Sequence, residues 1–562
     1  MKRSIKQILT FILLLSFLCT VNSQNVNDQF DLQNNLSRYA KVWGLLKYYH
    51  PEIAKGKIDW DSVLVVHLPS VKIADTKVKY NSELEKLLDI AGDVEICDTC
   101  HIINNDSIKR YPDLEWVKDT AFFSQSVIER LEFIINNKYP FDNFYVQSVE
   151  GIGCTSYENE KAYSEMVYPS EEYRLLALFR YWNVINYYFP YKHLMDRKWN
   201  EVLMEFIPKF VNASDTIDYH LLVFELAANI NDSHGISMSP LLFAYWGNMF
   251  LPFSTSYYES NTVITKIYKQ MDSMNVLKVG DIIVKLNNKL VSELRQDWLK
   301  YFAGSNEKSK QAVIDLLLFR TNNDTIDILI SRKNQMLNLK VKSLSIDELK
   351  PIIITERSSG TILKRISINI AYINLANLEK GDVDSIMHEA TQYESIIFDL
   401  RGYSRNTMYQ ISEYLNPEKK CFTLIYSPDL DFPGVFRYTD MLEVGPDSIN
   451  SNYYKGKVVV LIDINTQSHG EFACMALQTA PDVTIIGSKT SGADGNVSNF
   501  RLPGNITVRF SGIGIAYPNG IETQRIGIIP DIFIEQTIRG IINKKDDVLE
   551  KAITVLRQRN SF

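Results

Sequence analysis

One serine stands where a buried strand is predicted to give way to a helix. Residues 458–463 read VVVLID, an apolar run typical of a buried strand, and a helix is predicted at 468–480. Ser468 therefore falls at the start of that helix, where backbone N–H groups have no intrahelical acceptor and the helix dipole favours negative charge. This position suits a nucleophile whose attack on a carbonyl creates an oxyanion.

The same serine also has a purely structural interpretation. Ser468 is followed three residues later by Glu471, which is the spacing of a capping box, in which both side chains satisfy N–H groups at a helix start. On spacing alone, the cap is the commoner arrangement. The adjacent His469 is a poor base for Ser468, because neighbouring residues on a helix do not face each other.

A second histidine is a better candidate for a general base. His234 lies in the segment NDSHG at residues 231–235, after a predicted helix at 218–230. A neutral imidazole can accept a proton from a serine hydroxyl near pH 7. The alternative is a loop histidine without a catalytic role. The sequence contains no HExxH, P-loop, dinucleotide-binding or EF-hand pattern.

The composition limits the class of protein. The chain has 562 residues, of which 45% are hydrophobic and 23% are charged, a balance typical of soluble globular proteins. Its length predicts about three or four domains. The net charge of −7 argues against a nucleic-acid partner, since binding phosphates requires a basic face.

The first 23 residues have the pattern of a secretory signal peptide. Three cations (Lys2, Arg3 and Lys6) precede an apolar run at 8–19, and small residues precede an expected cleavage site at Gln24. We therefore expect a periplasmic or secreted protein. A lipid anchor on Cys19 is the alternative. No later apolar run is long enough to span a bilayer, so no transmembrane segment is expected in the mature chain.

Five cysteines follow this segment. Cys97, Cys100 and His101 have the CxxCH spacing of a c-type haem site, but a local disulfide or a structural metal pair is the preferred interpretation. Cys421 and Cys474 lie in apolar contexts and are expected to be buried thiols. A haem-carrying protein remains an alternative function.

The N-terminal half contains an internal repeat. Residues 43–64 align without gaps with residues 182–203, and each copy predicts two helices joined by a proline and a loop. Aromatic residues at this spacing are more often core than ligand platform. The identical pairs are Trp43 and Trp182, Tyr48 and Tyr187, Tyr49 and Tyr188, Pro51 and Pro190, Trp60 and Trp199, Val63 and Val202, and Leu64 and Leu203.

Two further patterns follow along the chain. Short strands are predicted within 255–345, and residues 277–287 (LKVGDIIVKLN) resemble the Gly-Asp strand of PDZ domains. PDZ domains bind peptide ends by adding a strand to a sheet edge. Strands then alternate with helices from about 365, with strands predicted at 366–375, 395–400, 457–464 and 483–486. This alternation predicts an α/β layer structure.

Four motifs in one order resemble the C-terminal processing (tail-specific) serine proteases, particularly their tricorn-like branch. They are DLRG at 399–402, TQSHGE at 466–471, IGSKTSG at 486–492 and GIIPD at 527–531. The resemblance covers roughly residues 230–555. It implies a ClpP/crotonase-like core at 350–562, a PDZ-like domain at 255–345 and a mainly helical N-terminal region at 24–250 that contains the duplication.

The resemblance also implies roles for individual residues. Ser468 would be the nucleophile, and the N–H groups of Gly402 and His469 would form the oxyanion hole. Many members pair the serine with a lysine, but Ala493 occupies that position here. In the tricorn-like branch a Ser-His pair serves instead, so His234 would be the base and Ser233 would relay a hydrogen bond to the group that orients it.

The orienting group is left open by the sequence. The family's glutamate position holds Gln524, and the nearest carboxylate is Glu522. On a strand these two residues would share a face and either could reach Ser233, with Glu522 preferred and Gln524 as support. The resemblance thus implies an exported serine endopeptidase that acts on peptides or unfolded proteins without a cofactor or metal. A non-catalytic peptide binder and a hydrolase of non-peptide esters are the alternatives.

Overall fold

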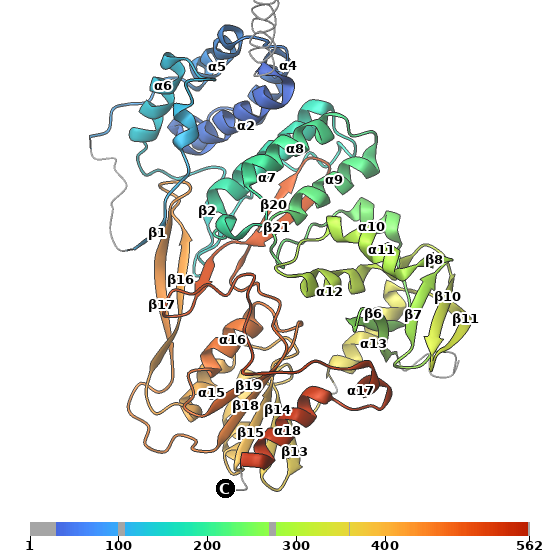
Figure 1. Ribbon diagram of the computed structural model, residues 1–562. Helices are drawn as coiled ribbons and strands as arrows, with labels where there is room; N and C mark the ends of the chain where they lie inside the picture. The colour runs from blue at the N-terminus through green and yellow to red at the C-terminus, as the bar shows by residue number, and fades with distance from the viewer. Residues whose placement is uncertain (1–29, 99–106, 269–276, 359, 560–562) are drawn as a thin grey trace, which may run out of the picture.

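The structure is a computed structural model that describes residues 30–98, 107–268, 277–358 and 360–559. The helical N-terminal part lies at one end of the molecule and a sheet with flanking helices at the other, with a smaller β-rich part at the side (Figure 1). The predicted signal peptide, Cys100 and His101 lie outside the described residues. Among the described residues, no helix is both long and apolar enough to cross a bilayer.

The duplicated segments form two similar helix pairs. The first pair is α2 (Leu32–Tyr49) and α4 (Trp60–Lys72), and the second is α7 (Glu171–Tyr188) and α8 (Trp199–Val211). In each pair the two tryptophans exchange indole N–H bonds with each other's carbonyl oxygens, at 3.0 and 3.1 Å in the first pair and 2.9 and 3.0 Å in the second. The aromatic side chains of both copies are buried in one core.

Further helices complete the N-terminal part. They are α3 (Pro51–Ala54), α5 (Lys77–Ala91), α6 (Gln125–Asn136), α9 (Thr216–Ala228) and α10 (Pro240–Trp246). The helix predicted at 218–230 corresponds to α9, which begins two residues earlier because Asp215 caps it through the Asp218 N–H. The loop that follows α9 carries His234.

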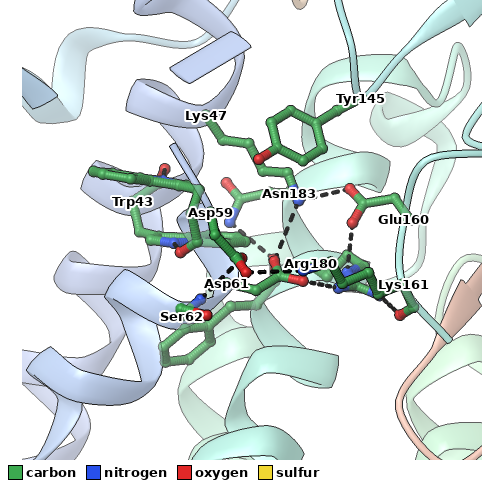
Figure 2. Close-up of polar contacts among 12 residues, drawn as sticks. Trp43, Lys47, Asp59, Asp61, Ser62, Tyr145, Glu160, Lys161, Arg180 and Asn183 are labelled. Atoms are coloured by element: carbon green, nitrogen blue, oxygen red, sulfur yellow. Dashed lines mark hydrogen bonds and ion pairs between the residues drawn. The ribbon is translucent and has the colours of Figure 1, made fainter. Parts of the chain in front are cut away.

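A cluster of buried charges joins the two helix pairs (Figure 2). Glu160 lies between Lys47 Nζ at 2.6 Å and Arg180 Nε at 2.8 Å, and Arg180 Nη2 donates to Asp61 Oδ2 at 2.6 Å. The Lys47, Glu160 and Arg180 side chains are fully buried and that of Asp61 is 6% exposed. Two cations thus balance two carboxylates out of reach of water.

Breaking this balance should destabilise the helical part. The Glu160→Gln variant is expected to lower the free energy of unfolding by about 3–5 kcal/mol, because Asp61 alone of the two carboxylates then balances the buried charges of Lys47 and Arg180. Denaturant unfolding followed by tryptophan fluorescence measures the effect. The matched control is Glu158→Gln on the exposed side chain two residues earlier, which should change stability by no more than about 0.5 kcal/mol. Equal stabilities of the two variants would contradict this account.

The side part of the molecule is an antiparallel sheet with the strand order β11-β10-β7-β6-β5. Its strands are β5 (Phe253–Tyr258), β6 (Asn261–Ile267), β7 (Ile282–Leu286), β10 (Thr325–Arg332) and β11 (Gln335–Lys342). Helices α11 (Val291–Trp298) and α12 (Glu307–Leu317) lie between β7 and β10 in the chain, and α13 (Ile346–Ser358) follows β11. The PDZ-like assignment of this part remains a prediction.

The C-terminal part is built on a six-stranded sheet with the order β13-β14-β15-β18-β19-β23. Strands β14 (Ile370–Asn374), β15 (Ser395–Asp399), β18 (Lys457–Ile462), β19 (Val483–Gly487) and β23 (Ile532–Phe533) are parallel, and β13 (Leu363–Ser367) is antiparallel. The single strand predicted at 366–375 is therefore wrong: the chain turns between β13 and β14.

Helices cover both faces of this sheet. Helices α14 (Val383–Ala390), α15 (Met408–Leu415) and α16 (His469–Leu477) pack with one set of apolar strand residues, and α18 (Asp547–Arg559) packs on the other. This arrangement explains why the strands are continuous apolar runs. The predicted mixed α/β fold is confirmed, whereas the ClpP/crotonase-like assignment remains a prediction.

Two β-hairpins extend from the sheet toward the N-terminal part (Figure 1). One consists of β16 (Lys420–Pro428) and β17 (Phe436–Val444). Strand β1 (Ile108–Arg110) pairs with the outer edge of β17, and β22 (Gly514–Ala516) pairs with the outer edge of β16. The other consists of β20 (Val497–Leu502) and β21 (Ile506–Ser511). A backbone bridge between Met238 and Thr507 joins β21 to the loop after α9. The second hairpin thereby brings the C-terminal part to His234.

Candidate active site

The segments that follow β15, β18 and β19 meet at the carboxyl edge of the parallel sheet. After β18 the chain turns into α16 through Thr466, whose hydroxyl donates to the Leu400 carbonyl at 2.9 Å. The loop after β19 lies against the same turn, because Ser491 N–H donates to the Thr466 carbonyl at 3.1 Å. Parallel strands thus place three loops around Ser468.

Ser468 has a backbone conformation that few residues other than glycine adopt. Its φ is +56° and its ψ is −123°, whereas a serine that caps a helix usually has extended angles. Such a conformation costs about 1–3 kcal/mol and persists only where neighbouring contacts impose it. The conformation favours the interpretation of Ser468 as a nucleophile over that of a simple cap.

Glu471 imposes part of this conformation. Its fully buried carboxylate accepts hydrogen bonds from the N–H groups of Ser468 (3.2 Å), Gly492 (2.7 Å) and Ala493 (3.0 Å), and from the Thr490 hydroxyl. The carboxylate half of the predicted capping box is therefore present, and it also binds the loop after β19. Burial raises the pKa of Glu471 to about 7, against the effect of these four donors.

The loop after β15 carries one of the two N–H groups expected to form an oxyanion hole, and it contacts the residue that carries the other. The ring of His469 accepts a hydrogen bond from the Asn406 N–H at 2.8 Å, which holds the loop after β15 over the start of α16. Within the described residues, neither the Gly402 N–H nor the His469 N–H has an acceptor. Both donors are therefore free for a ligand.

Glycine is required at position 402 for a close approach. A Cβ atom there would lie 2.7 Å from the Cβ of Ala376. The neighbouring Arg401 fixes the loop through hydrogen bonds to Asp399 and Asp546, at 2.6 to 2.9 Å. The loop that presents the Gly402 N–H is thus held by partly buried ion pairs.

His234 is oriented by a hydrogen-bond chain that the sequence did not reveal. Ser511 Oγ donates to Asp232 Oδ1 at 3.0 Å and lies 2.9 Å from His234 Nδ1. Because the single hydroxyl proton goes to the carboxylate, Ser511 Oγ must accept the proton of Nδ1–H. This assignment leaves Nε2 of His234 unprotonated, which is the form required of a general base.

Asp232 is the fixed end of this chain. It is fully buried and also accepts the N–H groups of His234 (3.0 Å) and Ser511 (2.6 Å) and the amide of Gln524 (3.1 Å). Burial lowers the pKa of His234, the Asp232 charge raises it, and the Arg509 charge lowers it. The position of Asp232, two residues before His234, was the only sequence signal for this role.

Ser233 does not occupy the relay position that was expected for it. Its hydroxyl accepts the Ser305 N–H at 2.9 Å and donates to the Ser491 carbonyl at 3.2 Å. The Gln467 side chain donates to the Ser233 carbonyl at 3.3 Å. Residues adjacent to His234 and Ser468 are thus in contact, although no hydrogen bond joins the His234 ring to Ser468 Oγ in the part of the chain that the structure describes.

Glu522 lies elsewhere than expected. Its carboxylate accepts from Arg110 and Tyr426 at 2.7 Å each and lies 2.8 Å from His193 Nε2. Burial raises the pKa of Glu522, but hydrogen bonds from His193 and Tyr426 outweigh this effect and lower the pKa to about 2. The expectation that Glu522 and Gln524 share one face of a strand is wrong. The chain turns at 524–526, and the two side chains therefore diverge.

A cavity of about 910 Å³ opens beside Ser468 and His469. Its walls combine apolar side chains, such as Ile425 and Phe472, with polar ones, such as Asp440 and Asp494. Such a cavity is large enough to hold several side chains of a peptide.

The remaining cysteines have simpler environments. Cys97 is disulfide-bonded. Among the described residues, Cys154, Cys421 and Cys474 are free thiols. Cys474 is fully buried as expected, whereas Cys421 is partly exposed.

Comparisons with known proteins agree with this architecture. Residues 369–534 match the model of peptidase family S41. Mature CPAF is 13% identical over 70% of this chain and 99% of its own, with a TM-score of 0.54, and CPAF complexed with lactacystin is 12% identical over 69% and 98%, with a TM-score of 0.53. The photosystem II D1 C-terminal processing protease is 13% identical over 64% and 93%, with a TM-score of 0.40.

A search of curated protein sequences finds no match to this chain. The similarity to CPAF at this low identity shows a shared fold. The family match covers the strands and loops that surround Ser468, including Gly402 and the loop after β19. Residues 369–534 are thus a serine peptidase domain of family S41, the family of the tail-specific proteases.

Proposed function

We propose that this protein is an exported endopeptidase of the tricorn-like kind, which hydrolyses peptide bonds through Ser468 with His234 as the base. The observation that carries the proposal is the chain from Asp232 through Ser511 to His234, which sets the imidazole tautomer with Nε2 free. Nε2 accepts the Ser468 hydroxyl proton while Oγ attacks the peptide carbonyl. The proton then passes to the leaving amine, and water releases the acyl group.

The negative oxygen of the tetrahedral intermediate requires two donors. The N–H groups of Gly402 and His469 are free to bind it, and the dipole of α16 adds positive potential at this point. The reaction requires Nε2 and Oγ to come within about 2.6–3.2 Å in the substrate complex. The contact between Gln467 and Ser233 keeps the two segments together, and the proposal requires that the substrate complex brings Nε2 within reach of Oγ.

Other features of the proposal rest on the sequence motifs. The signal-peptide pattern of residues 1–23 supports a periplasmic or secreted location. The sheet β11-β10-β7-β6-β5 is assigned as a PDZ-like domain, and the parallel sheet with its helices as a ClpP/crotonase-like core. The substrates are peptides or unfolded proteins, and no cofactor takes part in the mechanism.

Digestion of unfolded casein tests the proposal. The wild-type protein should produce fragments that mass spectrometry assigns to internal peptide-bond cleavage, and Ser468→Ala should produce none. Ser451→Ala, at an exposed turn, is the matched control and should cleave like the wild type. Peptide binding without cleavage by the wild type would instead favour a non-catalytic binder, and ester hydrolysis without cleavage would favour a non-peptide hydrolase.

A further inference from the structure

One arginine near the active site contacts all three parts of the molecule. The Arg525 guanidinium donates from Nε to the Ser305 carbonyl at 3.2 Å, in the turn before α12 of the side part. From Nη1 it donates to the Leu194 carbonyl at 2.5 Å and to Asp196 Oδ1 at 2.7 Å, both between α7 and α8 of the N-terminal part. Its backbone N–H donates to the Gly492 carbonyl at 2.8 Å, in the loop after β19 of the C-terminal part.

Two of these partners hold the segment that carries His234. Ser305 and Ser233 exchange hydrogen bonds, since the backbone N–H of each donates to the other's Oγ at 2.9 Å. Asp196 and Asn231 form a second reciprocal pair, in which the Asp196 N–H and the Asn231 amide each donate at 2.9 Å. A single guanidinium therefore binds both supports of the segment that places the base.

The backbone of Arg525 is connected to the nucleophile. The Gly492 N–H donates to Glu471 Oε1 at 2.7 Å, and Glu471 Oε2 accepts the Ser468 N–H at 3.2 Å. The two chain segments are in close contact, because a Cβ atom on Gly492 would lie 3.0 Å from the carbonyl carbon of Arg525. One loop residue and one carboxylate thus join Arg525 to the backbone of Ser468.

The conformation of Arg525 is unusual for a long side chain. Its φ is +66°, in the left-handed region that residues other than glycine adopt infrequently. Such a conformation costs free energy, persists only where surrounding contacts impose it, and is concentrated at functional sites. Arg525 is not among the residues that line the cavity beside Ser468, so it is not placed to touch the substrate.

We propose that Arg525 is a positioning residue, which sets the placement of His234 Nε2 relative to Ser468 Oγ. This inference rests on the proposed peptidase function and adds a residue to its machinery. The guanidinium fixes the segment of the base, and the backbone N–H of the same residue fixes the loop that binds the nucleophile. Arg525 touches neither the substrate nor the reacting atoms.

The Arg525→Ala variant tests this role through separate values of kcat and KM. We expect kcat for a quenched fluorescent peptide to fall about 100-fold, because a misplacement of about 1 Å between reacting groups has an effect of this size. KM should stay within about 3-fold, because the cavity that binds the substrate is unchanged. Arg365→Ala, on an exposed residue of β13, is the matched control and should keep the wild-type kcat.

Chemical rescue distinguishes positioning from a general loss of structure. Ethylguanidinium supplies the group that the alanine variant lacks, and it should raise kcat of Arg525→Ala at least about 10-fold while leaving the wild type unchanged. Arg525→Lys keeps the charge but not the planar fork of donors, so its kcat should be at least about 5-fold below the wild-type value. Thermal unfolding shows which variants are folded, and the lysine variant carries the test if the alanine variant is not.

The outcomes separate the two proposals. A kcat within about 5-fold of the wild type in a folded Arg525→Ala or Arg525→Lys variant would overturn the role of Arg525 and leave the peptidase intact. A fall in kcat of Arg525→Ala that ethylguanidinium does not restore would also overturn it. Failure of the wild type to cleave the peptide, together with no fluorophosphonate labelling of Ser468, would overturn the peptidase proposal itself.

Discussion

The His234→Ala variant is expected to lose about four to six orders of magnitude in kcat for peptide hydrolysis. The reason is that the residues described in the structure offer no second base for the Ser468 proton: His469 uses its ring to bind the Asn406 N–H, and Ala493 stands where related enzymes have a lysine. Removing the base of a serine-histidine pair lowers kcat by a factor of this size. The measurement is kcat with a quenched fluorescent peptide at saturating concentration.

The matched control for this variant is another histidine far from the cavity. His388 lies exposed on α14, where its ring contacts the Asp384 carbonyl at 2.8 Å. His388→Ala should keep kcat within about 2-fold of the wild type. A His234→Ala variant with more than about one-tenth of the wild-type kcat would contradict the assignment of His234 as the base.

The Asp232→Asn variant is expected to reduce kcat by about 10³ to 10⁴-fold. An asparagine can donate to Ser511 Oγ, which then no longer fixes the Nδ1–H tautomer of His234, and it lacks the charge that stabilises the imidazolium. Asp232 raises the pKa of His234, so its loss should lower that pKa further. The acid limb of kcat/KM, where the base becomes protonated, should therefore move to lower pH.

This shift distinguishes a positioning role from simple loss of structure. Ser511→Ala removes only the relay hydroxyl, because the Ser511 N–H bond to Asp232 is made by the backbone. It should reduce kcat in the same direction as Asp232→Asn, with thermal unfolding close to that of the wild type. Reduced kcat with an unmoved acid limb in Asp232→Asn would argue against the charge effect, and full activity in Ser511→Ala would exclude the relay.

The parallel strands were predictable because their residues are buried on both sides. β15, β18 and β19 agree within a few residues with the predicted strands at 395–400, 457–464 and 483–486, and α16 with the helix at 468–480. The hairpin of β13 and β14 was missed, since its apolar residues continue across the turn without a glycine or proline. Helices α11 and α12 were also missed, because strand-like segments dominate the pattern around them.

The site was only partly predictable, for reasons of distance along the chain. Ser468 and His234 could be proposed from the sequence because each lies in a short motif. Ser511 lies 277 residues from His234, and its contact depends on the hairpin of β20 and β21 reaching the N-terminal part. Glu522 was assigned from spacing alone, and the turn at 524–526 directs it to Arg110, His193 and Tyr426 instead.

The rate at which a fluorophosphonate labels the protein tests the central claim most directly, since this reagent reacts with a serine only when a base activates it. Mass spectrometry of the labelled wild-type protein should place the adduct on Ser468, and His234→Ala should be labelled at least about 10³-fold more slowly. Equal labelling rates in the two proteins, or an adduct on another residue, would show that His234 does not activate Ser468.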